Sequence, residues 1–570
     1  MLFGLLCWDI HGVYALANIS MLKPFDLPCV LGFVTWMVHR SVDPMDVTVS
    51  PIGSEGSDSF EICSDSIGAG SELGTSRIDD SEVMSDASGI SVDGNSEPGY
   101  DVAQASPMTR VCSSMVEAIP SEHHALLRQN LLRLGAFGLL AVGSACSGTD
   151  LFFPALGMLT SILCASVGVP SFCWTNLWAC EYDAMKQEWL QTVMGVHSVV
   201  ADIHDLATGG LCRMVGGGQK VIGDIFLFSC GFSCKSVSFQ NKNRKKYRGC
   251  TLRGSGTTGR TYRSALKTIR RLLPFFVFLE NVSGLSSKDR KAVRRDLEKL
   301  GYMVLIVESD ARARGIPVRR VRVWFIAVLA PGMDDAERYH FQHAANWIKT
   351  VTSRAPMHLS EFMLDRDDPD YAVWLDKMLS KTRSSKGAAR GVKWRDLHRH
   401  VLAKHGKSNK DLQHIGKELH VKAFMACYCF TERERQCVLM DMLFHPHDHA
   451  NTTSTIIWDI SQSADRVPRG VDIAPTVLPS AKCVVRSEGG GLRRLFGLEG
   501  LFLQGFERQM CFDPEALTLF SDADLQHLAG NAYSVPQVHL ALVVALCLFP
   551  VPGSPVELEQ LRNRARGIPF

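Results

Sequence analysis

The chain has 570 residues, of which 46% are hydrophobic and 21% charged, and a net charge of +2. This length and composition indicate a globular protein with one large core or two moderate ones. Its eighteen cysteines have no regular spacing and follow no secretory signal, so we exclude a disulfide framework and expect a reducing, intracellular compartment. The apolar runs at residues 1–6 and 28–38 are too short to span a membrane, so we predict no membrane segment and no membrane partner.

The first part of the chain changes composition near residue 40. Residues 1–40 are apolar without a regular pattern, and their role stays open. Residues 41–108 contain fourteen Asp or Glu, a single Arg and almost no aromatic side chains, so they bury too little apolar surface to fold alone. We predict a disordered acidic linker over residues 41–120. An inert, solubilising role is preferred, and contact with a histone or another basic protein is the alternative.

From about Leu131, short apolar runs alternate with amphipathic stretches, the pattern of a sheet covered by helices. We predict strands at residues 139–142, 172–179, 224–229, 275–279, 303–307 and 322–329, and helices at 184–194, 264–273 and 288–300. The expected fold over 131–330 is an α/β domain with a doubly wound, mostly parallel sheet. Its site is expected at the carboxyl ends of the strands.

Residues 331–490 lose this alternation. Lys381 to Lys422 carry twelve Lys or Arg against three acids, which predicts a separate basic domain that the overall charge conceals. Residues 491–550 return to apolar, helix-like patterning that could complete the first domain, and 551–570 form a tail.

Two turns of the predicted sheet favour a cofactor. The turn from Gly143 to Asp150 follows the first strand, and its small residues let a cofactor approach the backbone and a helix N-terminus. Glu181 follows the second strand, where an acid can accept hydrogen bonds from a ribose diol, and Asp202 comes about twenty residues later. This order predicts an adenosine-containing cofactor. Helix capping or simple solvation is the alternative for both acids.

Two further turns carry the chemistry. One reads Gly231-Phe232-Ser233-Cys234 and ends on Ser238; the other reads Glu280-Asn281-Val282. This pair resembles the catalytic motifs of the DNA cytosine-5 methyltransferase family. Later segments resemble that family's remaining motifs in order: Gly315-Ile316-Pro317 with Arg319, Arg320 and Arg322; Arg493-Arg494-Leu495 with Glu499 and Leu503 to Phe506; and Gly530-Asn531-Ala532 with Pro536 and Val538.

The resemblance covers residues 137–330 and 490–550, with the basic region 331–490 where the family has its target-recognition domain. It implies a Rossmann-like methyltransferase domain and S-adenosylmethionine as methyl donor, with S-adenosylhomocysteine as product. The implied cofactor-binding residues are Ala145, Cys146, Ser147, Gly148, Thr149, Glu181, Tyr182, Asp202, Ile203, Asn531 and Ala532.

The resemblance also implies a covalent mechanism. The Cys234 thiolate would add to carbon 6 of cytosine, and carbon 5 would then become nucleophilic. Protonated Glu280 would hydrogen-bond the ring, with Asn281 beside it. Arg322, together with Arg320, would hold the base oxygen or the sugar-phosphate and favour the thiolate.

The implied substrate is double-stranded DNA whose target base is flipped into the pocket. Residues 241–273 contain eleven Lys or Arg and no acid, so we expect backbone contacts there. The expected DNA-binding residues are Arg244, Lys245, Lys246, Arg248, Arg253 and Arg260. A nuclear location follows from this substrate.

No metal is expected. The cluster of Cys427, Cys429, Cys437, His445, His447 and His449 does not have the ligand spacing of a zinc site.

The chain departs from the family pattern at several positions. Ser233 and Lys235 replace the usual Pro and Gln beside the nucleophile, Val318 replaces a usual Gln, and the first motif keeps only Gly148 of its usual glycines. Three functions therefore stay open. An active DNA methyltransferase is preferred over a tRNA cytosine-5 methyltransferase and over a catalytically inactive protein that binds nucleic acid.

Overall fold

The computed structural model describes residues 105–146, 148–238, 251–384, 393–418, 430–450, 453–486 and 491–568. All of them lie in the unit Glu97–Phe570. The apolar segment 1–40 and most of the acidic linker lie outside the described residues.

A seven-stranded sheet organises this unit, in the order β3-β2-β1-β6-β7-β9-β8. Its strands are β1 (Leu140–Ala145), β2 (Trp174–Cys180), β3 (Val199–Val200), β6 (Leu227–Cys230), β7 (Phe276–Val282), β8 (Tyr302–Asp310) and β9 (Val321–Leu329). Strands β3, β2, β1, β6 and β7 pair in parallel, whereas β9 enters antiparallel between β7 and β8. The predicted α/β fold with a mostly parallel sheet is confirmed. The two-residue strand β3 was not predicted.

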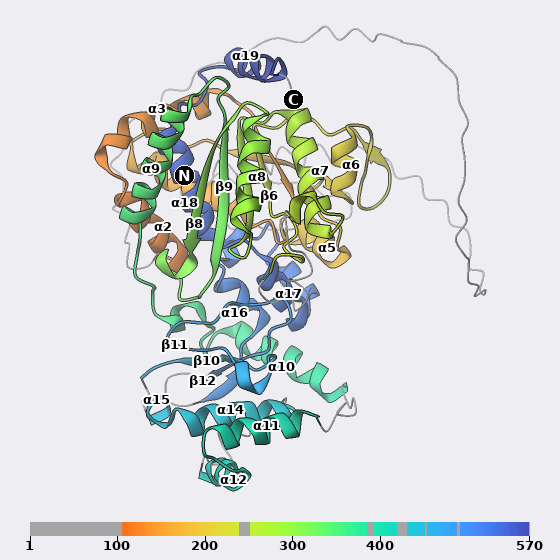
Figure 1. Cartoon of the computed structure of the whole chain (residues 1–570), viewed down its shortest axis with the longest axis vertical. Coiled ribbons are helices and arrows are strands. Elements are labelled where there is room, and N and C mark those ends of the chain that lie inside the picture. Colours follow the sequence, from red (N-terminus) through yellow and green to blue (C-terminus); the bar gives the residue numbers. More distant parts are fainter. Residues whose placement is uncertain are drawn as a thin grey trace, which may run out of the picture. The chain divides into compact units, whose positions relative to one another are not determined.

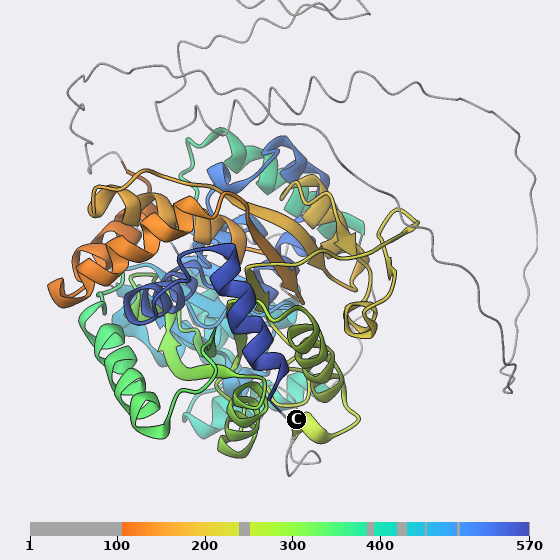
Figure 2. The same cartoon turned by 90° about the horizontal axis from the view of Figure 1, so that it is seen from above.

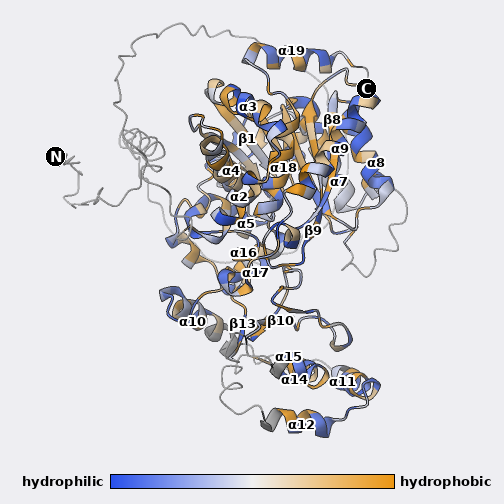
Figure 3. Cartoon of the chain, turned by 90° about the vertical axis from the view of Figure 1, so that its left-hand side faces the viewer, coloured by the Kyte–Doolittle hydropathy of each residue, from blue (hydrophilic) through white to orange (hydrophobic). Residues whose placement is uncertain are grey.

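Helices cover both faces of the sheet. In Figure 1, α7 (Thr257–Leu272) and α8 (Ser287–Glu298) lie in front of the strands and α18 (Val535–Leu548) lies behind them, where it packs on α4 (Phe152–Ser166). Helices α5 (Ala184–Thr192) and α6 (Ile203–Thr208) pack against β3. Figure 3 shows hydrophobic residues concentrated on the strands, α4 and α18, with polar residues on the outer face of α8. This is the layered burial that alternating strands and helices require.

Helix α18 is the core helix of the unit, because every one of its residues is buried. It contacts α4, α9 (Asp335–Val351), β8 and β9 as well as the N-terminal helices. By length and composition alone, the segment Asp522–Leu548 could cross a membrane, but 94% of its most apolar window is buried inside the protein. An apolar helix enclosed by sheet and helices is what a large soluble core also produces.

Two helices precede the sheet and were not predicted. Helix α2 (Pro107–Glu117) buries Met108, Val111, Cys112, Met115 and Val116, and α3 (His124–Ala136) follows it. The linker predicted over 41–120 is therefore wrong in its last part, where a Pro at N1 and a Ser106 cap start an amphipathic helix.

A second, four-stranded sheet lies in the region predicted to be basic. Its strands are β10 (Ile456–Asp459), β11 (Arg469–Val471), β12 (Cys483–Arg486) and β13 (Leu492–Arg494), all antiparallel. The helices of this region are α10 (Pro369–Ser384), α11 (Lys393–Lys404), α12 (Asn409–Glu418), α14 (Glu432–Phe444) and α15 (Pro446–Ala450).

The predicted boundaries of this region are displaced at both ends. Helix α9 (Asp335–Val351) belongs to the first sheet, because the side chain of Gln342 bonds both backbone groups of Ile306 on the edge strand β8. At the other end, β13 pairs with β12 although it follows residue 490. Sequence composition did not reveal either contact.

The C-terminal segment is helical rather than a tail. Helix α19 (Pro555–Arg566) lies across the end of the sheet where β6 and β7 begin (Figure 2), and Arg562 donates to the carbonyls of Leu273 and Ile225. The opposite end of these strands is thereby left for the site.

Asn130 joins α3 to the end of α18. Its buried amide donates to the carbonyls of Leu546 and Phe549 at 2.7 Å each and accepts from the Val551 N–H at 2.8 Å. We expect Asn130→Ala to lower the free energy of unfolding in urea by about 2–4 kcal/mol, because three buried backbone groups lose their partner. The exposed Gln129→Ala on the same helix is the control. Equal stability of the two variants would contradict this role.

Candidate active site

The candidate site lies at the carboxyl ends of β1, β6 and β7 and the start of β9. Beyond β6 the chain turns at once, and the Cys234 carbonyl accepts the N–H groups of Val237 and Ser238 at 3.0 and 2.9 Å. These bonds close a tight turn around Cys234, whose side chain is half-buried. The sequence therefore sets the nucleophile candidate on a fixed turn rather than on a long loop.

Three predicted catalytic residues meet here. Glu280 lies on β7 and Arg322 on β9, and antiparallel pairing of Val282 with Arg322 sets the two side chains beside each other. Arg322 Nε lies 2.8 Å from Glu280 Oε1, and the two side chains are only 12% and 15% exposed. Glu280 and Arg322 therefore form a partly desolvated ion pair near the turn that carries Cys234.

Burial shifts the pKa values of both the carboxyl and the thiol of the site upward. Burial raises the pKa of Glu280 above its ordinary value, and Arg322 and Arg320 only partly oppose this shift. Burial also raises the pKa of the Cys234 thiol, Glu280 raises it further, and Arg322 and Arg320 lower it. A raised carboxyl pKa favours the protonated acid that can donate a hydrogen bond, while the thiol needs cationic neighbours to ionise.

Arg320 has a different position from the one expected. Its side chain is buried and its guanidinium donates to the carbonyls of Ala532, Gly530 and Val477. Burial lowers the pKa of Arg320 to about 9, with Arg322 acting in the same direction. These bonds point it at main-chain oxygens rather than at a base, so it joins the C-terminal segment to the site.

Asn281 also acts on the backbone. Its side-chain amide donates to the Phe232 carbonyl at 2.8 Å, and its oxygen accepts the Val282 N–H at 2.9 Å. Since Phe232 is two residues before Cys234, Asn281 fixes the first half of the nucleophile turn to β7.

A second group of predicted residues lies beside this turn. We call it the cradle, and it includes Gly148, Glu181, Asp202 and Asn531. Gly148 has a φ of +68°, and a Cβ there would lie 2.9 Å from the Asn531 carbonyl oxygen, so only glycine fits. A Cβ on Gly231 would lie 3.0 Å from both the Cys146 carbonyl and the Tyr533 hydroxyl. The turns after β1 and β6 and the end of α17 (Asp522–Asn531) therefore approach one another through backbone atoms.

Three carboxylates follow the strands that border the cradle. Glu181 is buried and accepts the N–H groups of Tyr182, Asp183 and Gly148 at 2.9, 3.3 and 3.3 Å. Asp150 accepts from the hydroxyl of Ser144 at 2.9 Å, and Asp202 caps α6 through the His204 N–H at 2.9 Å. Capping, the alternative reading for Asp202, is thus present. The carboxylates of the cradle can attract a positive charge and accept hydrogen bonds from hydroxyl groups. The cradle therefore fits a cationic cofactor that carries hydroxyl groups.

The other predicted cofactor residues differ in what they present. The Tyr182 side chain is 77% exposed, beside Glu181, whereas Ala145, Thr149, Ile203 and Ala532 are buried and can offer backbone atoms only. Asn531 donates to the His527 carbonyl at 2.8 Å, Cys146 is half-buried, and Ser147 lies outside the described residues.

Residues 146–542 match the family model of the C-5 cytosine-specific DNA methylase, which is more than half of the chain. The chain belongs to this family. Among its relatives, DNA (cytosine-5-)-methyltransferase DMT5 of Cryptococcus neoformans is 24% identical over 427 residues, 71% of this chain. Type II methyltransferase M2.ScrFI of Lactococcus lactis is 30% identical over 119 residues, 20% of this chain. These matches span 17% and 32% of the two relatives' lengths.

Similar solved structures are methyltransferases too. The S. pombe Dnmt2 methyltransferase covers 71% of this chain and 98% of its own, at 12% identity and a TM-score of 0.34. The Entamoeba histolytica methyltransferase EhMeth covers 71% of this chain and 97% of its own, at 11% identity and a TM-score of 0.36.

The structure describes only two of the DNA-binding residues expected for this chain, Arg253 and Arg260. Arg253 is 52% exposed but forms an ion pair with Asp296 at 2.6 Å, and Arg260 is exposed on α7. Arg244, Lys245, Lys246 and Arg248 lie outside the described residues. Arg253 is therefore held by α8 although half of its side chain is exposed, and Arg260 is exposed near the start of α7.

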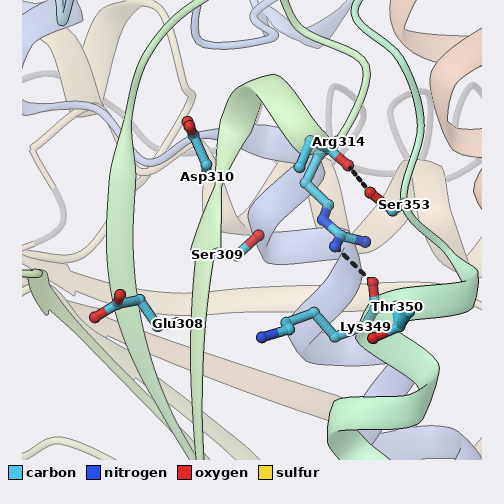
Figure 4. Close-up of a pocket in the computed structure, with 8 residues that line it drawn as sticks. Glu308, Ser309, Asp310, Arg314, Lys349, Thr350 and Ser353 are labelled. Atoms are coloured by element: carbon cyan, nitrogen blue, oxygen red, sulfur yellow. Dashed lines mark hydrogen bonds between the residues drawn. The ribbon is translucent and has the colours of Figure 1, made fainter.

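No metal centre is found within the part of the chain that the structure describes: no three His, Cys, Asp or Glu side chains there are arranged to hold an ion. Cys427 and Cys429 lie outside that part. A cavity of about 300 Å³ lies between the end of β8 and the last turn of α9 (Figure 4). There Arg314 donates to the Thr352 hydroxyl and the Lys349 carbonyl, and none of Cys234, Glu280 or Arg322 lines it.

Two residues around the nucleophile were not foreseen. Thr258 and Thr261 at the start of α7 accept hydrogen bonds from the Cys234 turn. Threonines at a helix start have no distinctive sequence signal, and their partners lie 22 and 28 residues away, so only the contacts reveal them.

The pairing of Glu280 with Arg322 predicts how the Cys234 thiol titrates. Because the Glu280 charge raises the Cys234 pKa, we expect Glu280→Gln to lower it and to speed alkylation of Cys234 at neutral pH about threefold to tenfold. The measurement is iodoacetamide labelling across pH, followed by mass spectrometry of the Cys234 peptide, which separates it from the exposed Cys173. Glu308→Gln on β8 is the control. A pKa that stays the same or rises in Glu280→Gln would refute this coupling.

Proposed function

We propose that this chain is a DNA (cytosine-5)-methyltransferase that forms a covalent adduct between Cys234 and a flipped cytosine. The observation that supports this most directly is the meeting of Cys234, Glu280 and Arg322 at one end of the sheet, beside the carboxylate-lined cradle. The names of both curated relatives, a DNA cytosine methyltransferase and a type II methyltransferase, are consistent with it.

The cradle is the proposed site of S-adenosylmethionine, whose sulfonium would supply an electrophilic methyl group. Gly148 leaves room for close approach, while Glu181 and Asp202 offer carboxylate oxygens to ribose hydroxyls and Asp150 adds negative charge near a cation. The exposed ring of Tyr182 offers a flat apolar surface beside Glu181.

The chain's own residues then act on the base. The Cys234 thiolate adds to carbon 6, which turns carbon 5 into a nucleophile. Glu280, with its raised pKa, donates its proton in a hydrogen bond to N3 and stabilises the adduct. Arg322 favours the thiolate and holds the base oxygen when the base separates it from Glu280.

Duplex DNA is the proposed substrate, with a nuclear location as its consequence. Arg260 and the basic segment before it would contact phosphates, whose binding offsets the cost of unstacking the base. Transfer to tRNA and binding without catalysis are the other two outcomes that the first experiment separates. For the acidic segment we keep an inert, solubilising role as the preferred one, with contact to a histone or another basic protein as the alternative.

The proposed chemistry predicts a covalent, Cys234-dependent product. We expect labelled S-adenosylmethionine to methylate duplex DNA, duplex DNA with 5-fluorocytosine to trap an adduct, and Cys234→Ser to lose at least about 1,000-fold of the rate. Purified tRNA is the comparison substrate, and methyl-donor binding by Cys234→Ser is the folding control.

Label in tRNA alone would reject the DNA substrate and retain the chemistry. Salt-dependent DNA binding, without binding of S-adenosylmethionine and without methyl transfer, would support the inactive protein that binds nucleic acid. A fully active Cys234→Ser would refute the covalent mechanism.

The proposed cradle predicts the effect of Glu181. Its carboxylate organises three backbone N–H groups as well as facing the cofactor, so we expect Glu181→Ala to weaken S-adenosylmethionine binding at least about tenfold by calorimetry. Glu188→Ala, exposed on α5, is the matched control. Unchanged affinity in Glu181→Ala would remove Glu181 from the site.

A further inference from the structure

The turn that carries Cys234 is held from one side by helix α7. The Ser233 N–H donates to the Thr261 hydroxyl at 3.1 Å, and the Ser236 N–H donates to the Thr258 hydroxyl at 3.1 Å. The two amides flank the nucleophile, one residue before it and two residues after it. The phenyl ring of Phe232 packs on Tyr262 of the same helix, with ring centroids 5.4 Å apart.

The Ser236–Thr258 bond is buried and the Ser233–Thr261 bond is partly buried. Thr258 is fully buried and Ser236 nearly so, and an unbonded N–H there would be costly. Thr261 also donates back to the carbonyls of Thr257 and Thr258 at 3.0 and 3.2 Å, which orients its oxygen toward Ser233. The geometry of the Thr261 acceptor is therefore fixed by the helix.

The bond to Thr261 requires a residue other than proline at position 233, because its donor is the backbone N–H. A proline at this position would have no N–H to satisfy and would restrict φ by its ring. Serine restores both the donor and the freedom of the backbone, and the Thr261 hydroxyl accepts that donor. The Thr261 side chain on α7 thus restrains the backbone of Ser233, which lacks the restraint that a proline ring would give.

We propose that Thr258 and Thr261 are positioning residues, which hold the Cys234 turn against α7 so that the thiol faces the base beside Glu280. Asn281 holds the turn from the opposite side through Phe232, so the turn is fixed between α7 and β7. The inference rests on the proposed function for its catalytic consequence. Its structural consequence, the accessibility of the thiol, does not depend on it.

The experiment compares single-turnover adduct formation on 5-fluorocytosine duplex DNA by purified full-length variants. We expect Thr258→Val and Thr261→Val to slow adduct formation about 10-fold to 100-fold, because the thiol is displaced from its line of attack. The KM for DNA and the Kd for S-adenosylmethionine stay within about twofold of wild type, because neither hydroxyl belongs to the cradle or the DNA surface.

Three further variants separate positioning from general stability. Thr261→Ser keeps the hydroxyl and is expected to retain the rate. Thr268→Val removes a buried hydroxyl of the same helix that bonds only the Ser264 carbonyl at 3.0 Å, so it should also retain the rate. Ser233→Pro combined with Thr261→Val removes the unbonded N–H and should recover part of the lost rate.

Alkylation of Cys234 by iodoacetamide gives a readout without substrate. We expect both valine variants to react at least about threefold faster than wild type, because a released turn exposes the thiol. Wild-type adduct and alkylation rates in both valine variants, or equal losses in Thr268→Val, would overturn the proposal. If wild type forms no adduct, the proposed function fails and the alkylation rates alone decide the positioning.

Discussion

The pairing of β9 with β7 is the constraint on which the candidate site depends. A parallel extension of the sheet would have carried the residues after β8 to the far end of the strands, away from Cys234. Antiparallel entry of β9 instead returns the chain to the carboxyl end of β7, so that Arg322 begins its strand where Glu280 ends its own. A one-residue slip would send Arg322 to the other face of the sheet and leave Glu280 buried without a cation.

The same segment joins the C-terminal part of the chain to the site. Arg320 donates to the carbonyls of Gly530 and Ala532, and Gln537 at the start of α18 donates to the Arg320 and Ser309 carbonyls at 2.8 and 2.6 Å. Because α18 is wholly buried, this connection holds the segment Gly530-Asn531-Ala532 in place beside the cradle. Gly148 and Asn531, almost 400 residues apart in sequence, thereby come together at the site, which explains why the basic region can be inserted between them.

The sequence predicted those parts of the architecture that have a local pattern of apolar and polar residues. Buried strands are short apolar runs, so β1, β2, β6, β7, β8 and β9 were found within a few residues, and the polar turns after them indicated the site. Contacts between distant segments have no such pattern. The displaced domain boundaries, the backbone role of Arg320 and the hydroxyls of Thr258 and Thr261 therefore became visible only in the structure.

Helix α2 was missed for a related reason. Its apolar residues, from Met108 to Val116, recur at helical spacing, but the acidic segment before them dominates the composition of residues 41–120. There Val111 packs over Gly315, and Glu507 accepts the Met108 N–H at 2.9 Å. Burial raises the pKa of Glu507, so this contact sets a poorly solvated carboxyl against the start of α2.

The departures around Cys234 can be understood in the same physical terms. Loss of a proline before the nucleophile adds an N–H and a free φ, and both would loosen the turn unless another group accepts the donor. Thr261 supplies that acceptor, and Asn281 and Thr258 hold the residues on either side. The turn is therefore restrained by three side chains from two elements, so the altered motif is compatible with a fixed nucleophile and does not by itself indicate an inactive protein.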